Sequence, residues 1–401
     1  MTKNRPLEGF RVLEIASMIF GPVAGMYLGD MGADVIKLEP PEGDLTRHIG
    51  PRRTPAMSAF FLSSNRSKRS IVVDLKQAEG QDILNTLLAN TDVLLQSMRT
   101  PAATRLGLDY DSLKLKYPKL VYCHVTGYGE EGVYAGRPAY DDIIQAASGL
   151  AMLQTSVGGV PRFIPTIVAD KVSGVHAAYG ILLALLQRHK TGRGQQVDVA
   201  MFETMAAFNM LEHQWGHCFQ PPLAGMGYEP VSTASRRPYQ TQDGYLALLP
   251  YTDVHWNRFF ELAGHAQVMN DERFSTFAAR QKNFRHVWDE IERQVAKKTN
   301  AQWLMLLTPE DIPFSLVNKL EDLPNDPHLK SVDFWQTKEH PSQGLLNYPR
   351  NPIRMSDADT DVSRLQPVLG EHTAEVLSEC GFSEEDIRRL QAVGGACHPL
   401  F

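Results

Sequence analysis

The feature that most limits the possible folds is a strand–helix–strand pattern at residues 11–39. Residues 12–15 predict a buried strand, an apolar helix follows, and residues 34–38 form a second apolar run. Two strands joined by one helix predict a parallel pair and an α/β fold with a Rossmann-like sheet. The turn at residues 17–25 has no GxGxxG motif and places Pro22 where that motif needs free backbone. The chain is therefore not expected to be a nicotinamide dehydrogenase.

A second strong pattern covers residues 164–201. A short apolar run ends at Asp170, where a helical pattern begins, and basic residues followed by Gly192 end that pattern. The β-branched run 197–201 then predicts another strand. Asp170 thus lies at a helix N-terminus, where its side chain can cap backbone N–H groups and the helix dipole favours its charge. The helical spacing is carried by Val172, Val175, Tyr179, Leu182, Leu183 and Leu186.

The remaining patterns divide the chain into a large and a small domain. Strands are expected at 93–96 and 120–126, and helices at 80–89, 201–211, 367–377 and 383–392. The Pro- and Gly-containing stretch 221–238 resembles a linker. Between residues 239 and 325, strand signals alternate with amphipathic helices, which predicts an α+β domain. We expect a large Rossmann-like domain at 1–220 completed by 330–401, a linker at 221–238 and a small domain at 239–325.

Composition and charge exclude several classes of protein. The chain has 401 residues, 43% of them apolar and 21% charged, as expected for a globular protein of two domains. A net charge of −6 provides no basic field for nucleic acid or anionic membrane. The four cysteines form no CxxC pair, the first residues do not resemble a signal peptide, and the longest aliphatic run, 181–186, cannot cross a bilayer. We expect a cytoplasmic protein without nucleic-acid or membrane partners.

Three local patterns leave alternatives open. Segment 40–70 carries six basic residues, which form either a solvated surface or a cradle for phosphate groups. Two histidines and a cysteine lie within 213–218, but there is no HExxH motif and no third ligand at ordinary spacing, so no metal site is expected. Four residues either bind a second carboxylate of a diacid or are surface charges: His48, Arg52, Arg236 and Arg237.

Longer stretches of the sequence, in one order and spacing, resemble the class III CoA-transferase family, which includes formyl-CoA transferase and α-methylacyl-CoA racemase. The resemblance covers nearly the whole chain, so it is more specific than any single short motif. The stretches that carry it are 6–9, 32–39, 65–70, 168–174, 180–185, 188–195, 197–201, 243–244, 320–323, 325–327 and 369–373.

The resemblance implies roles for individual residues. Asp170 matches the nucleophilic aspartate of the transferases, and Tyr140 stands where the racemases carry an acid–base histidine. Ser97 and Met98 replace the Asn and Phe that the family uses near CoA, so those contacts cannot be transferred directly. The residues expected to contact CoA are Val73, Lys76, Arg105, Met201, Ser97 and Met98.

The expected activity is transfer of CoA from an acyl-CoA thioester to a free carboxylic acid. A carboxylate that attacks a thioester forms a mixed anhydride and releases CoA thiolate, which can return to give an aspartyl-CoA thioester. No permanently bound cofactor is expected, since the CoA thioester is a substrate, and the resemblance implies an interlocked homodimer. A tyrosine side chain, whose reference pKa in a free peptide is near 10, is a poor partner for α-proton exchange, which favours the transferase. The alternatives are an acyl-CoA racemase or epimerase of the same family and a non-catalytic CoA-binding protein.

Overall fold

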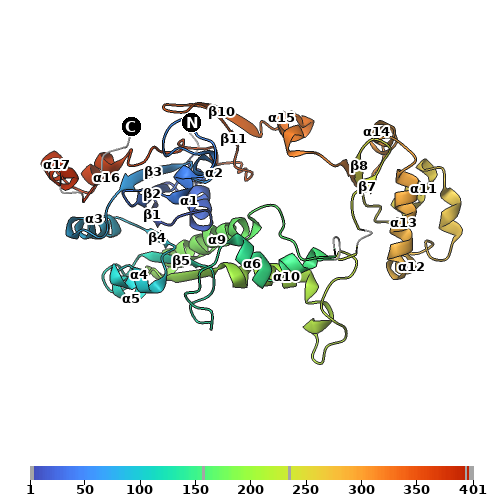
Figure 1. Cartoon of the computed structure of the whole chain (residues 1–401), viewed down its shortest axis with the longest axis horizontal. Helices are drawn as coiled ribbons and strands as arrows, with labels where there is room; N and C mark the ends of the chain where they lie inside the picture. Colours follow the sequence, from blue (N-terminus) through green and yellow to red (C-terminus); the bar gives the residue numbers. More distant parts are fainter. Residues whose placement is uncertain (1–3, 156–158, 234–235, 393–394, 397–401) are drawn as a thin grey trace. The chain divides into compact units, whose positions relative to one another are not determined.

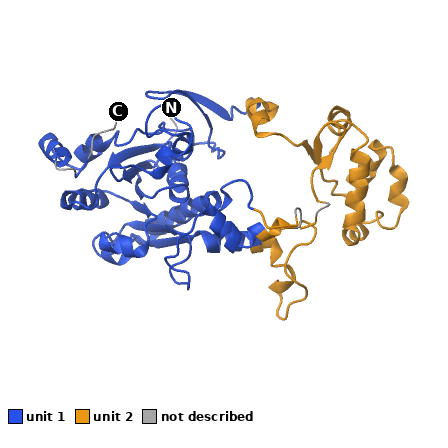
Figure 2. Ribbon diagram, viewed as in Figure 1, with its two compact units in different colours: residues 1–151, 163–209, 331–401 blue, residues 152–162, 210–330 orange. Residues whose placement is uncertain are grey.

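The computed structural model describes residues 4–155, 159–233, 236–392 and 395–396. The chain divides into two compact units (Figure 2). Unit 1 comprises residues 1–151, 163–209 and 331–401, and unit 2 comprises residues 152–162 and 210–330. Among the described cysteines, Cys123, Cys218 and Cys380 are free thiols.

Unit 1 is built on a parallel sheet of six strands in the order β3-β2-β1-β4-β5-β6 (Figure 1). Strand β1 lies between β2 and β4, with Val12 paired to Val35 on one side and to Val93 on the other. The strand order therefore reverses between β1 and β4, as in a doubly wound Rossmann-like sheet. This confirms the predicted α/β fold. The strands are β1 (Arg11–Ile15), β2 (Asp34–Glu39), β3 (Lys68–Val72), β4 (Val93–Gln96), β5 (Val121–Thr126) and β6 (Gln196–Ala200).

Helices cover both faces of this sheet (Figure 1). One face, which carries Leu13, Ile36 and Leu94, forms an apolar core with helices from the middle and the C-terminal part of the chain. These helices are α3 (Ala78–Ala89), α4 (Thr100–Arg105), α5 (Tyr110–Leu113), α16 (Thr373–Glu379) and α17 (Glu384–Ala392). The opposite face packs against α1 (Phe20–Asp30) and α9 (Val168–Thr191).

Buried charges lie between α1 and the sheet. Because side chains alternate along a strand, Glu14 and Lys37 point away from the apolar core, and both are fully buried. Lys37 Nζ lies 3.0 Å from Glu14 Oε1, and Lys68 Nζ lies 2.8 Å from Glu14 Oε2. Burial lowers the pKa of Lys68 to about 8, with the Glu14 charge acting against it. Gly25 is required here, because a Cβ at that position would lie 1.9 Å from Glu14 Oε2.

Helix α9 forms where the sequence predicts it, with Gly192 at its C-terminus at a φ of 71°. Its buried face consists of small residues and two larger ones: Ala169, Ser173, Gly174, Ala177, Ala178, Ile181, Ala184 and Leu185. Gly174 allows this close packing, since a Cβ there would lie 2.9 Å from Val23 Cγ1 of α1. The large apolar residues Val175, Tyr179, Leu182, Leu183 and Leu186 are 40–59% exposed. By length and composition alone α9 would also pass for a membrane span, but it is a core helix of unit 1.

The basic residues of segment 40–70 are mostly structural, and for four of them both alternatives from the sequence are wrong. The four side chains are buried and ion-paired, so they are neither solvated nor available to phosphate. The pairs are Arg47–Glu39 at 2.7 Å, Arg66–Asp30 at 2.9 Å, Lys68–Glu14 at 2.8 Å and Arg69–Asp34 at 2.6 Å. The pattern failed because each acidic partner lies on another element, and no local run of basic residues indicates that partner.

Unit 2 is an α+β unit with its own apolar core. A three-stranded antiparallel sheet, in the order β7-β8-β9, is accompanied by helices between residues 253 and 307. The core contains Phe259, Phe260 and Trp303, and the indole Nε1–H of Trp303 donates to Val295 O at 2.9 Å. The elements are β7 (Tyr239–Gln240), β8 (Tyr245–Leu248), β9 (Phe314–Leu316), α11 (Asp253–Leu262), α12 (Phe277–Lys282), α13 (Phe284–Val295) and α14 (Asn300–Leu307).

The other elements are short, apart from α10 (Met201–His213), which follows β6 directly. A β-hairpin of β10 and β11 forms in the C-terminal part of the chain. The short elements are α2 (Ala59–Ser64), α6 (Asp141–Ala147), α7 (Leu150–Leu153), α15 (Pro327–Ser331), β10 (Trp335–His340), β11 (Gly344–Pro349), and the 3-10 turns Leu45–His48, Trp215–Cys218, Ala266–Asn270 and Leu320–Asn325.

Candidate functional site

A cavity of about 280 Å³ lies in unit 1, next to the carboxyl ends of the central strands. Ligands of doubly wound sheets bind at these strand ends, where the strand order reverses. Five of the residues singled out in the sequence line this cavity: Asp170, Tyr140, Ser97, Met98 and Met201. The other lining residues belong to segments 17–20 after β1, 97–99 after β4, 125–130 at the end of β5, and 136–140.

Asp170 lies in the first turn of α9 and lines the cavity, and it has no ion-pair partner among the described residues. Its pKa is raised from an ordinary 3.8 to about 6, first by burial and then by the negative charge of Asp141, while a hydrogen bond from the Phe20 backbone N–H acts in the opposite direction. At pH 7 a carboxyl with a pKa of about 6 is roughly nine-tenths ionised. Asp170 is therefore a carboxylate of raised basicity at neutral pH.

Asp141, the first residue of α6, takes the capping role that the sequence suggested for Asp170. Its Oδ1 accepts the N–H of Ala169 at 2.7 Å and that of Asp170 at 3.4 Å, while Ile167 at the N-cap makes no side-chain bond. The prediction that α9 begins near Asp170 is confirmed, and the prediction that Asp170 itself caps the helix is wrong. The two carboxylates consequently share one helix N-terminus.

Gln145 holds the segment that leads into α9. It is fully buried, and its amide Nε2 donates to Asp141 Oδ2 at 2.6 Å and to the carbonyl of Thr166 at 3.3 Å. Its Oε1 accepts the backbone N–H of Ile164 at 2.9 Å. The NH₂ group and the carbonyl oxygen of this one side-chain amide therefore both fix the position of the turn before Asp170.

The wall formed by residues 97–99 is held through the main chain of Met98. Gln96 Oε1 accepts the Met98 N–H at 2.6 Å, and His124 Nε2 lies 2.9 Å from the Met98 carbonyl oxygen. His124 is 4% exposed, and its Nδ1 is 3.8 Å from Asp198 Oδ1. These two contacts fix the position of the Met98 backbone in the cavity wall.

The wall after β1 is supported by the buried charges. Lys37 Nζ donates to the Ala16 carbonyl at 2.7 Å, and the Met18 N–H donates to Asp44 Oδ1 at 3.4 Å. Met18 has a φ of 65°, a left-handed conformation that costs a non-glycine residue roughly 1–2 kcal/mol. Lys37 also pairs with Asp44 at 2.9 Å. The buried network thus determines the shape of one wall of the cavity.

Tyr140 is 64% exposed and precedes α6, so packing in the core does not explain its presence. Two arginines, Arg99 and Arg137, also line the cavity. Neither makes an ion pair within the described part of the chain, and Arg137 lies over the Tyr134 ring at 4.2 Å. The cavity therefore combines a carboxylate nucleophile candidate, a phenol and positive charge.

Three of the residues expected to contact CoA do not line this cavity. Val73 is buried and pairs with Ala396 in an isolated bridge, and Lys76 and Arg105 are exposed. Lys76 follows β3 at the same carboxyl edge of the sheet, with its backbone N–H bonded to Asp74 Oδ1 at 3.0 Å. These three positions stay predictions.

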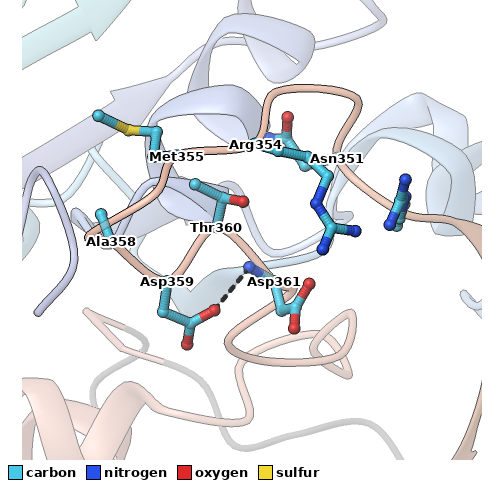
Figure 3. Close-up of a pocket in the computed structure, with 8 residues that line it drawn as sticks. Asn351, Arg354, Met355, Ala358, Asp359, Thr360 and Asp361 are labelled. Carbon is cyan, nitrogen blue, oxygen red and sulfur yellow. Dashed lines mark hydrogen bonds between the residues drawn. The ribbon is translucent and has the colours of Figure 1, made fainter. Parts of the chain in front are cut away.

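Other candidate sites in the described chain are less suited to the expected chemistry. A cavity of about 350 Å³ is lined by residues of segment 350–361 (Figure 3), where Asp359 accepts the N–H of Asp361 at 2.9 Å and pairs with Arg5. None of the predicted site residues lines it. No group of three or more His, Cys, Asp or Glu side chains in the described residues could hold a metal ion. His213 instead accepts the N–H of Tyr228 at 3.1 Å.

Sequence reasoning missed Asp141, Gln145, Gln96 and His124. Only Asp141 and Gln145 left a signal in the sequence. They are four residues apart, so they lie on one face of a helix, and that helix begins directly after Tyr140. The role of His124 depends on a contact between two strand ends, which no local pattern contains.

Comparisons of the sequence with a family model and with known proteins indicate the same family of CoA-transferases. The model of the family described as CoA-transferase family III matches residues 7–373. The chain is 33% identical to succinate–glutarate CoA-transferase of Agrobacterium fabrum, covering 94% of this chain and 96% of that protein. It is 31% identical to cinnamoyl-CoA:phenyllactate CoA-transferase of Clostridium sporogenes, covering 96% and 95% of the two chains. It is also 32% identical to formyl-CoA:oxalate CoA-transferase of Streptomyces avermitilis, covering 98% and 99%.

Two solved structures share the fold along nearly their whole length. A CAIB/BAIF family protein from Brucella suis superimposes with a TM-score of 0.80 at 33% identity, covering 94% of this chain and all of that chain. The orthorhombic form of Rv3272 from Mycobacterium tuberculosis has a TM-score of 0.82 at 30% identity, covering 93% and 99%.

Proposed function

Because this chain belongs to CoA-transferase family III, we propose that it transfers CoA from an acyl-CoA thioester to a free carboxylic acid through covalent intermediates on Asp170. The observation that carries the proposal is the Asp170 carboxyl group, which lines the cavity at the strand ends with its pKa raised to about 6. Raised basicity increases the nucleophilicity of a carboxylate that is still mostly ionised at neutral pH.

The proposed reaction has four covalent steps. The Asp170 carboxylate attacks the thioester carbonyl, the C–S bond breaks, and CoA leaves as thiolate from a mixed anhydride. The thiolate then attacks the Asp170 carbonyl, so that the donor acid leaves as carboxylate and Asp170 carries CoA as a thioester. The acceptor carboxylate attacks this thioester and again releases thiolate. Attack of the thiolate on the acceptor carbonyl yields the new acyl-CoA and restores Asp170.

The cavity supplies groups for this sequence of steps. The phenol of Tyr140 can donate a hydrogen bond to an acyl or anhydride oxygen, where negative charge develops during attack. The guanidinium groups of Arg99 and Arg137 suit the carboxylates and phosphates of the substrates. Met98 and Met201 provide apolar surface for the pantetheine or acyl chain.

The racemase alternative is less well supported. A racemase needs an acid–base pair on opposite sides of the α-carbon, with pKa values near the working pH. No histidine is among the described residues that line the cavity, and Tyr140 occupies the position of the expected histidine. A racemase would exchange the α-proton of an acyl-CoA with deuterated water without any acceptor acid, and the transferase would not.

The acceptor class is a carboxylic acid. Three relatives at 31–33% identity are named for dicarboxylates, an aryl hydroxy acid and oxalate. The three identities are too similar to single out one of these relatives, and the acids in their names have only the carboxylate group in common. We therefore propose a carboxylate acceptor and no individual acid.

We also propose that the functional form is a homodimer, which the resemblance implied. The support is the row of five large apolar residues on α9, from Val175 to Leu186, that are 40–59% exposed. Contiguous apolar surface of this kind is uncommon on monomers and marks interaction sites. Analytical ultracentrifugation should give twice the chain mass, and Leu183→Glu should reduce it, whereas a monomeric wild-type chain would contradict the dimer.

The test of the covalent mechanism is trapping during turnover. Hydroxylamine added with an acyl-CoA should convert Asp170 to a hydroxamate, which peptide mass mapping can locate. Asp170→Asn should abolish both label and transfer, while Asp142→Asn, at an exposed neighbouring carboxylate, should retain both. Turnover with the label on another residue, or turnover by the Asp170→Asn protein, would exclude the mechanism.

A further inference from the structure

Unit 2 contains a separate cavity of about 200 Å³, formed entirely by its own elements. Its walls come from residues within 228–231 and Arg236, from residues 249–251 after β8, and from α11, α12 and α13. It lies beside the apolar core of the unit, to which Trp256 and Val287 also belong. The cavity is thus part of the folded unit and not an irregularity of a loop.

Aromatic rings dominate the walls of this cavity. They are Tyr228, Tyr251, Trp256, Phe277, Phe284 and Trp288. Tyr251 and Phe277 meet edge to face with centroids 6.3 Å apart, and Phe284 and Trp288 do so at 5.3 Å. Tyr251 is 63% exposed and Phe277 49% exposed, so part of this aromatic surface is accessible from solvent. Such walls favour a ligand with a flat or compact apolar body.

The charged residues of the lining are both arginines. Arg280 is 3% exposed, and its guanidinium lies 5.4 Å from the centre of the Trp256 ring. It donates to the Phe274 carbonyl and pairs with Asp253, but its Nε–H has no hydrogen-bond partner in the described chain. A buried donor without a partner costs about 1–3 kcal/mol, and an acceptor atom of a ligand would remove that cost.

Arg236 supplies a second positive charge at the rim. It is exposed, and it makes no ion pair with any described residue. Neighbouring arginines behave differently, since Arg237 pairs with Glu292 at 2.7 Å and Arg285 with Glu229. No aspartate or glutamate of the described chain lines the cavity. Asp253 balances the charge of Arg280, so the unpaired charge of Arg236 is what favours an anion in this cavity.

We propose that this cavity is a binding site for a small carboxylic acid with an apolar, preferably aromatic, body. The rings hold the apolar part, and Arg236 and the free Nε–H of Arg280 bind the carboxylate. This site is distinct in its residues from the Asp170 cavity, and the proposal does not depend on the chemistry at Asp170.

The experiment uses the full chain labelled with 5-fluorotryptophan, with its five tryptophan signals assigned by single Trp→Phe substitutions. Phenylacetate is the probe, and phenylacetamide, which has the same shape without the charge, is its neutral control. Phenylacetate should shift the fluorine signals of Trp256 and Trp288 saturably and leave that of Trp303, which is buried in the core, unchanged. Phenylacetamide should bind about tenfold more weakly, the loss expected for one charge-assisted hydrogen bond.

Matched variants test the role of the charge. Arg236→Gln should weaken phenylacetate binding by about tenfold, whereas Arg237→Gln, which removes an adjacent ion-paired arginine, should leave it unchanged. The absence of saturable shifts at Trp256 and Trp288, equal binding of acid and amide, or equal losses in the two arginine variants would each overturn the proposal. The readout requires no turnover, so its failure is distinguishable from failure of the proposed transferase activity.

Discussion

Replacing Asp170, the proposed nucleophile, should stabilise the folded protein at neutral pH. Because the pKa of Asp170 is raised from 3.8 to about 6 in the fold, the folded state binds protons more tightly than the unfolded chain. The free energy of unfolding therefore falls as pH rises from about 4 to 6. Above pH 6 the ionised Asp170 carboxylate lowers it by up to roughly 3 kcal/mol, because each unit of pKa shift corresponds to 1.36 kcal/mol. Asp170→Asn removes this cost.

The assay is calorimetry of wild type and Asp170→Asn between pH 4 and pH 8. The variant should gain stability relative to wild type as pH rises, by up to about 3 kcal/mol at pH 8, with little difference at pH 4. Asp141→Asn provides the internal control, because it removes the second cause of the raised pKa, and the gain from Asp170→Asn should shrink in that background. A gain that is the same at pH 4 and pH 8 would refute the reasoning.

Three further outcomes follow from the same geometry. The acid limb of the pH–rate profile should have an apparent pKa of about 6, and Asp141→Asn should move it lower but not below about 4, because burial remains. His124→Leu should alter the KM for acyl-CoA by releasing the Met98 carbonyl, and His124→Gln, which can restore the hydrogen bond, should recover much of the wild-type value. Gly25→Ala should destabilise the protein by more than 3 kcal/mol in denaturant unfolding, because its Cβ would meet Glu14 Oε2 in a buried ion pair.

The sequence predicted five strands of the unit 1 sheet and the start of α9, because these depend on local patterns of apolar residues, but it missed β3 (Lys68–Val72), whose basic residues hid the strand. It did not predict which face of α9 is buried. The regular apolar row, including Tyr179 and Leu183, is exposed, while small residues face the sheet. Close approach of α1 at Gly174 leaves no room for larger side chains, and this is a property of two helices and not of one.

The candidate site was only partly predictable for the same reason. Asp170 and Tyr140 could be found from a resemblance, since each occupies a recognisable motif. The charges near residue 68 were misread because a run of basic residues carries no information about buried acidic partners such as Glu14. Similarly, the contact of His124 with Met98 joins the ends of two strands that are adjacent only in the sheet.

The division of roles between Asp141 and Asp170 explains how the proposed nucleophile can stay basic. A carboxylate that accepts two or three backbone N–H groups can have a pKa below about 2, and such a weak base would be a poor nucleophile. In this fold Asp141 accepts the N–H groups at the start of α9, so Asp170 does not receive them. The charge on Asp141 then raises the pKa of Asp170 in addition to the effect of burial. Capping and nucleophilic attack therefore require different residues, and exchanging Asp141 for an uncharged residue should preserve the helix but weaken the nucleophile.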